Sequence, residues 1–203
     1  MLIKIYPENP NPREVKRVAE ILRNGGVIIY PTDTVYGIGC DMTKPKAVAR
    51  LAQIRGINLD KAHFSFIFCD LSQISDYTRQ FPNPIFKLMK RNLPGPFTFI
   101  LESNNNVPKL FKIKRKTVGI RVPDNSIVRE IVRELGNPIM SSSIHDEDEI
   151  IEYTTDPELI HEKFEHLVDI VIDGGYGDNH VSTIVDCTGE EPEITREGKG
   201  ILI

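Results

Sequence analysis

The chain has 203 residues, with 25 Lys or Arg and 29 Asp or Glu, so its formal net charge at pH 7 is −4. This balance excludes binding of nucleic acid through an overall basic surface, but it leaves room for a local basic patch. The length suits one domain with a core of its own, and we predict a single domain over 1–203.

Two features of composition point to a cytoplasmic protein. Cys40, Cys69 and Cys187 are too far apart for a disulfide framework or a zinc motif, which favours free thiols in a reducing compartment. The first residues, MLIKIYPENPNP, lack the apolar stretch of a signal peptide. No apolar run approaches the roughly 18 residues that a membrane helix needs. We therefore expect a soluble protein without a membrane partner.

Helix and strand patterns alternate along the chain. Asn11-Pro12 is typical of a helix start, and a 3.6-residue apolar period then continues to Gly25-Gly26, which ends the helix. The other predicted elements are a strand at 27–30, helices at 45–55, 83–92, 126–135 and from Asp156 to about 167, and strands at 63–69, 97–101, 118–122, 139–141, 169–173, 182–187 and 193–196. Several strands follow one another without a helix between them. This order predicts an α/β fold with a mixed sheet.

A polar motif at 31–41, PTDTVYGIGCD, follows the first buried strand directly. Small hydroxyl groups, carboxylates and glycines at a strand end are a common place for ligand contacts in α/β proteins. The same residues also suit a capped turn, in which Thr and Asp bind backbone groups. The motif alone leaves both interpretations open.

Arg121 lies within an apolar strand, in the sequence GIRVP at 119–123. A buried guanidinium is unfavourable unless a partner of opposite charge accompanies it. The sequence therefore predicts a carboxylate beside Arg121, which either the protein or a ligand supplies.

Hydroxyl groups recur at the ends of two later strands. Ser141, Ser142 and Ser143 end one of them, and the sequence STIVD at 182–186 begins another, with Arg196 downstream. Such groups suit hydrogen bonding to a small molecule, although polar loop residues would look the same.

In this order, the motifs resemble those of the YrdC/YciO family over nearly the whole chain. The segments that carry the resemblance are YPTDTVYGIGCD at 30–41, PGPFT at 94–98, IRVP at 120–123, PIMSSS at 138–143, STIVD at 182–186 and REG at 196–198. The family's fold is a twisted mixed β-sheet with flanking helices and a large concave cleft. That fold is therefore expected here.

The resemblance also implies a chemistry. Threonylcarbamoyl-adenylate synthases of this family are nucleotidyltransferase-type enzymes that join threonine, bicarbonate and ATP, release pyrophosphate and serve tRNA modification. Magnesium would accompany ATP, without a protein ligand of its own. By position, a threonine-like ligand would contact Thr34, Arg121, Ser141 and Ser182, and the nucleotide would contact Arg55, Thr117, Ser143 and Arg196.

Two positions differ from the synthase motifs. Gln53-Ile54-Arg55 replaces a Lys-x-Arg motif, and Ser143-Ile144-His145 replaces Ser-x-Asn. The missing lysine removes a charge-assisted contact worth roughly 1.5–3 kcal/mol, and the acidic run at 146–149 would repel a triphosphate if it faced the cleft. These differences resemble the YciO branch. They leave open whether the chain is a synthase or a binder or hydrolase of a related acyl adenylate.

Double-stranded RNA or tRNA is a further partner that the resemblance implies, for a module without catalysis. The basic stripe that would follow an RNA backbone consists of Lys109, Lys112, Lys114, Arg115 and Lys116. Such a stripe contacts phosphates without reading bases. A solvated loop that balances nearby acidic residues is the alternative.

Overall fold

The computed structural model describes residues 1–57, 64–107, 117–144 and 154–203. Its helices are α1 (Pro12–Arg23), α2 (Pro45–Ile54), α3 (Asn83–Asn92), α4 (Ser126–Leu135) and α5 (Pro157–Phe164), with a 3-10 turn at Ile74–Asp76. Its strands are β1 (Leu2–Lys4), β2 (Val27–Tyr30), β3 (Gly37–Asp41), β4 (Ser65–Ile67), β5 (Phe97–Glu102), β6 (Thr117–Arg121), β7 (Ile139–Ser143), β8 (Ile170–Asp173), β9 (Thr183–Asp186) and β10 (Glu193–Arg196).

All ten strands join one sheet in the order β1-β8-β2-β3-β7-β4-β6-β5-β9-β10. The sheet contains parallel pairs such as β4–β6 and β5–β9 and antiparallel pairs such as β3–β7 and β5–β6. The mixed α/β fold predicted from the order of elements is therefore confirmed. No helix within the described residues is long and apolar enough to cross a membrane.

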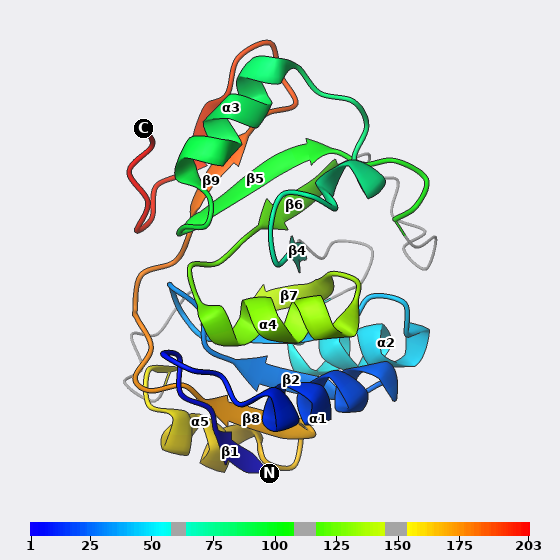
Figure 1. Ribbon diagram of the computed structural model, residues 1–203, viewed down its shortest axis with the longest axis vertical. Coiled ribbons are helices and arrows are strands. Elements are labelled where there is room, and N and C mark those ends of the chain that lie inside the picture. Colours follow the sequence, from blue (N-terminus) through cyan, green and yellow to red (C-terminus); the bar gives the residue numbers. More distant parts are fainter. Residues whose placement is uncertain (58–63, 108–116, 145–153) are drawn as a thin grey trace.

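Two apolar clusters cover opposite faces of the sheet. One contains residues of α1 and α4 with Ile28, Ile67 and Ile139, and the other contains residues of α2, α3 and α5 with Ile29, Phe66 and other sheet residues. In Figure 1, α1 and α4 lie together in front of β2, while α3 lies at the far end beside β9 and the C-terminus. The second face is therefore covered along more of its length than the first.

Capping residues define the helix ends where the sequence predicts them. The Asn11 side chain accepts a hydrogen bond from the Arg13 amide at 2.9 Å, and Pro12 occupies the first turn of α1. Gly136 follows α4 with a φ of +87°, a conformation that a residue without a Cβ adopts at little strain. The predicted helix at 126–135 therefore matches α4 at both ends.

Two strands were not predicted. The short β1 forms the sheet edge beside β8, and β3 occupies residues 37–41, within the polar motif that was expected to form either a ligand-contact segment or a capped turn. Glycine lowers strand propensity, so the pattern Gly-Ile-Gly conceals a strand. Pairing with β2 and β7 on either side overrides that propensity and makes β3 one of the inner strands of the sheet.

Candidate functional site

Small and polar residues form a row across one face of the inner strands. Strand register pairs Gly39 with Ser141, Ser141 with Ser65, and Ser65 with Gly119, so these four positions share a face. A Cβ on Gly119 would lie 3.2 Å from Thr98 Cγ2, which extends the row to β5. Between the α1–α4 cluster and strand β9, this face therefore presents hydroxyl groups and backbone in place of large apolar side chains.

Arg121 is held at one side of this row by a cluster that it forms with Thr34 and Asp33, here named the Arg121 cluster. Its Nη2 donates to Thr34 Oγ1 at 2.9 Å and lies 3.4 Å from Asp33 Oδ1. The Asp124 amide donates to the other Asp33 oxygen at 3.0 Å. The protein therefore supplies the carboxylate that the sequence predicted beside Arg121, from the 31–41 motif.

The Arg121 guanidinium retains unused binding capacity. Its side chain is only 10% exposed, and burial lowers the pKa of the guanidinium while the Asp33 carboxylate opposes that change. Within the part of the chain that the structure describes, its buried Nε has no hydrogen-bond partner. A buried donor without a partner is rare and unfavourable, so a ligand carboxylate would satisfy a group that the fold leaves open.

Ser141 lies beside the Arg121 cluster, in contact with Tyr30. The Tyr30 hydroxyl donates a short hydrogen bond to Ser141 Oγ, and burial raises the pKa of Tyr30, which keeps the phenol protonated. A Cβ on Gly37 would lie 2.9 Å from Tyr30 Cζ, and one on Gly39 would lie 2.7 Å from Met140 O. The glycines of the 31–41 motif therefore make room for the Tyr30 ring and for close strand pairing.

Ser182 marks the opposite side of the row, in a second group named the Ser182 cluster, which comprises Ser182, Thr98 and Arg196. Ser182 Oγ lies 2.8 Å from Thr98 Oγ1, and Arg196 Nη2 donates to the Ser182 carbonyl at 2.8 Å and to its hydroxyl at 3.1 Å. Arg196 belongs to β10, whose four residues are all exposed. The structure therefore joins one residue expected for a threonine-like ligand to one expected for the nucleotide.

The other residues expected at the nucleotide site are spread over three elements. Ser143 ends β7 opposite Gly37, half-buried on the same face as Ser141. Thr117 is exposed at the start of β6, opposite Glu102. Arg55 is half-buried and follows α2 as its C-cap residue. Ser143 thus lies close to the row, whereas Thr117 and Arg55 lie at the ends of other elements.

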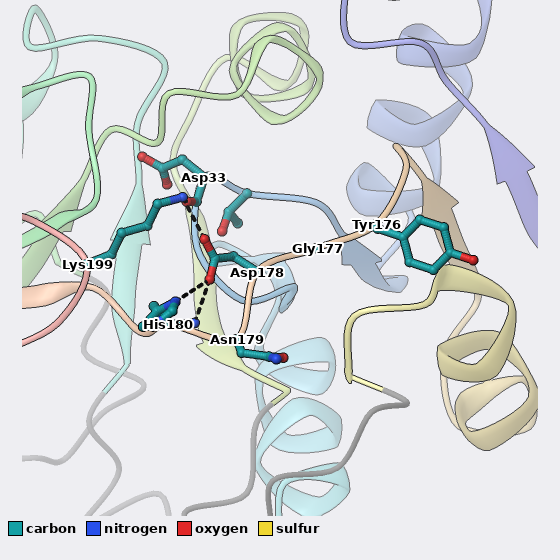
Figure 2. A pocket seen from close by; sticks show the side chains of 8 residues that line it. Asp33, Tyr176, Gly177, Asp178, Asn179, His180 and Lys199 are labelled. Carbon is teal, nitrogen blue, oxygen red and sulfur yellow. Dashed lines mark hydrogen bonds and ion pairs between the residues drawn. The ribbon is translucent and has the colours of Figure 1, made fainter.

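A pocket of about 420 Å³ opens beside the Arg121 cluster. Its lining residues are Thr32, Asp33, Tyr176, Gly177, Asp178, Asn179, His180 and Lys199. Asp178 accepts from Lys199 Nζ at 2.8 Å and contacts His180 Nδ1 at 2.7 Å. Figure 2 shows these three side chains turned toward one another, with the Tyr176 ring pointing away.

Sequence reasoning missed this pocket because its charged residues stand alone in the sequence. Asp178 and His180 lie in the connection between β8 and β9, and Lys199 follows β10. No motif links them, and only the fold brings them beside Asp33. A cleft extending over the whole sheet face stays a prediction.

Some expectations fall on residues outside the described ranges. These are the basic stripe of Lys109, Lys112, Lys114, Arg115 and Lys116, together with His145 and the acidic run at 146–149. Gln53, in place of the synthase lysine, is exposed on α2. Among the described residues, no group of three or more His, Cys, Asp or Glu lies together as a metal site would require.

Comparison with known proteins defines the family. The sequence profile of the family Sua5_yciO_yrdC, described as telomere recombination, matches residues 20–198. YciO of Escherichia coli K12, an uncharacterized protein, is 41% identical over 198 residues, which cover 97% of this chain and 94% of that one. The crystal structure of E. coli YciO matches with a TM-score of 0.90 at 39% identity and covers 99% of this chain and 97% of that chain.

More distant relatives carry a named activity. The threonylcarbamoyl-AMP synthase of Bacillus subtilis is 30% identical over 191 residues, which cover 93% of this chain and 54% of that one. The crystal structure of P. abyssi Sua5 complexed with L-threonine matches with a TM-score of 0.88 at 26% identity and covers 98% of this chain and 57% of that chain. The chain therefore belongs to the Sua5/YciO/YrdC family, as a YciO-like member related to threonylcarbamoyl-AMP synthases.

Proposed function

We propose that this protein binds an acyl adenylate of the threonylcarbamoyl type, or its threonine-like and adenylate parts, on the polar row of the sheet. The observation that carries the proposal is the buried Arg121, which donates to the Thr34 hydroxyl while its Nε has no partner among the residues that the structure describes. A guanidinium binds carboxylates through paired donors, and the ligand's carboxylate would take that position. The L-threonine complex of the related Sua5 supports this choice of ligand.

The adenylate part would extend toward the Ser182 cluster. Arg196 is exposed there and its guanidinium is already oriented by Ser182, so it is placed to contact a phosphate. One phosphate requires fewer cations than three. The exposed Gln53, where synthases have lysine, therefore favours AMP-containing ligands over ATP with its magnesium.

Ligand binding is tested by thermal unfolding with AMP, ATP and L-threonine at millimolar concentration. We expect AMP with L-threonine to raise the melting temperature, because a ligand that binds only the folded state stabilises it. Arg121→Met should abolish the L-threonine contribution and leave that of AMP. The absence of any shift with all three ligands would overturn the proposal.

Synthase activity itself is tested by pyrophosphate release from ATP with threonine and bicarbonate. We expect little release from the natural protein and more from the double variant Gln53→Lys, His145→Asn, which restores both synthase motifs. Equal and rapid release from both proteins would instead identify a working synthase, in which Gln53 does not lower the rate of pyrophosphate release. Because His145 lies outside the described residues, the single variant Gln53→Lys is measured as well, since it changes a residue that the structure describes.

RNA binding is a second candidate, favoured by one described surface. Lys87, Lys90 and Arg91 are exposed on α3, at spacings that place them on one side of the helix. Together with the basic stripe at 109–116, they would contact phosphates of double-stranded RNA or tRNA. The affinity should fall steeply with salt and with the triple variant Lys87→Glu, Lys90→Glu, Arg91→Glu. Binding that is insensitive to salt would contradict this candidate.

A further inference from the structure

The pocket beside the Arg121 cluster contains an aspartate–histidine pair. The His180 amide donates to Asp178 Oδ1 at 2.8 Å, and the His180 ring nitrogen Nδ1 lies 2.7 Å from the same oxygen. The other Asp178 oxygen accepts from Lys199 at 2.8 Å. Figure 2 shows the contacts of Asp178 with His180 and with Lys199 in the pocket.

This pairing defines the chemistry of the imidazole ring. Although desolvation acts to raise it, the pKa of Asp178 is lowered by hydrogen bonds from Lys199 and His180, so the carboxylate stays ionised. An ionised carboxylate beside Nδ1 favours the tautomer with its proton on Nδ1. Nε2 is then the basic nitrogen of His180, which is the arrangement of a general base and its orienting carboxylate.

The loop that carries this pair is attached to the Arg121 cluster. The Asp178 amide donates to the Thr34 carbonyl at 3.4 Å, and Lys199 Nζ donates to the Asp33 carbonyl at 2.6 Å. Tyr36, two residues after Thr34 in the chain, donates its hydroxyl hydrogen to the Gly175 carbonyl at 2.7 Å. The residues that would hold a ligand carboxylate and the residues that orient His180 are therefore joined by direct hydrogen bonds.

We propose that this pocket makes the protein an acyl-adenylate hydrolase, with His180 as general base and Asp178 as its positioning residue. This inference rests on the proposed function, because it requires an adenylate on the polar row. The Lys199 ammonium supports the pair by holding Asp178 and Asp33 together.

The proposed step uses one water molecule and no other reactant. His180 Nε2 takes a proton as the water oxygen bonds to the acyl carbonyl carbon. The bond between that carbon and the bridging phosphate oxygen then breaks, and its electron pair leaves with AMP. The products are the free acid and AMP, and the oxygen from water ends in the acid. Asp33, Asp178 and Lys199 are the charged residues that line the pocket around His180.

The test uses threonylcarbamoyl adenylate, made by a separate synthase and freed from it by filtration. We expect the full-length protein to release AMP faster than buffer does, and AMP formed in ¹⁸O-labelled water to carry no label. His180→Ala should lower the turnover number by about 100-fold or more, and added imidazole should restore part of it. Asp178→Asn should lower the turnover number with little change in KM.

His166→Ala is the matched control, because His166 is also exposed and contacts the adjacent Glu165 at 3.4 Å, but lies outside this pocket. Its rate should equal that of the natural protein. A non-hydrolysable sulfamoyl analogue separates binding from chemistry. If the analogue binds and AMP release does not exceed that in buffer, or if His180→Ala remains fully active, the hydrolase proposal is wrong and the proposed function stands. If the analogue does not bind, both are wrong.

Discussion

The Arg121 and Ser182 clusters place two arginines at opposite sides of one polar row, in contrasting environments. Arg121 is buried and paired with Asp33, whereas Arg196 lies on an exposed edge strand and donates to the carbonyl and hydroxyl of Ser182. A buried charge is stable only while its partners are present. An exposed charge tolerates substitution, because water replaces its partners. The comparison indicates that the Arg121 cluster helps to stabilise the fold, whereas the Ser182 cluster contributes little to its stability.

The largest expected effect comes from filling the space that Gly39 leaves between β3 and β7. In Gly39→Ala, the added Cβ would lie 2.6 Å from Ile139 Cγ2 and 2.7 Å from Met140 O. Because the neighbour on one side is backbone, we expect a loss of about 3 kcal/mol in unfolding free energy. Urea denaturation measures it. Gly189→Ala, where the nearest atom is 3.6 Å away, is the control, and an equal loss there would refute this explanation.

Removing the buried charge should have the next largest effect. Arg121→Met leaves Asp33 with the Asp124 amide and removes the donor to Thr34. We expect a loss of about 2 kcal/mol in unfolding free energy and, at the same time, the loss of carboxylate binding. Denaturation and calorimetric titration are the two measurements. A variant that keeps full stability would mean that the Asp33 pair contributes nothing to the fold.

The exposed arginine should separate binding from stability. Arg196→Met removes the donors to Ser182 from an exposed edge strand. We expect a loss of unfolding free energy below about 1 kcal/mol and about tenfold weaker binding of AMP. The same denaturation series and a titration with AMP check both numbers. A loss as large as that of Arg121→Met would remove the contrast between the two clusters.

The smallest predicted effect on stability is that of Asp178→Asn, and it should depend on pH. Since the pKa of Asp178 is lowered in the folded protein, its contribution is present above the unfolded value of about 3.9 and disappears as the pH falls through the folded value. Asp178→Asn should therefore destabilise the protein by less than about 1 kcal/mol at pH 7 and by a smaller amount at pH 2, where part of the contribution is already lost. Thermal unfolding at both pH values measures the difference. If the stability difference between Asp178→Asn and the natural protein grew toward low pH, it would contradict the lowered pKa of Asp178.

Much of the fold could be predicted from local patterns. The cap at Asn11, the glycine after α4 and the 3.6-residue periods all act within a few residues, so the sequence displays them directly. The strand β3 could not be predicted in this way. Its glycines are required by the Tyr30 ring and by strand β7, which lies about 100 residues later in the chain.

The site could likewise be predicted only where its signal lies within a short stretch of sequence. Arg121 stands out because a charge within an apolar strand requires a partner, but its pairing with Asp33 joins segments 88 residues apart. The pair of Asp178 and His180 lies within one loop, yet Lys199 and the Thr34 carbonyl, which come from distant parts of the chain, connect it to the Arg121 cluster. Chemistry that depends on such distant contacts becomes visible only in the folded chain.

The most direct test of a carboxylate site at Arg121 is a calorimetric titration with L-threonine and, separately, with L-threoninamide. The two ligands differ in the carboxylate that we assign to the guanidinium. We expect L-threonine to bind the natural protein, and we expect no binding of threoninamide and no binding of either ligand to Arg121→Met. Equal binding of the two ligands, or undiminished binding of L-threonine to the variant, would contradict the assignment.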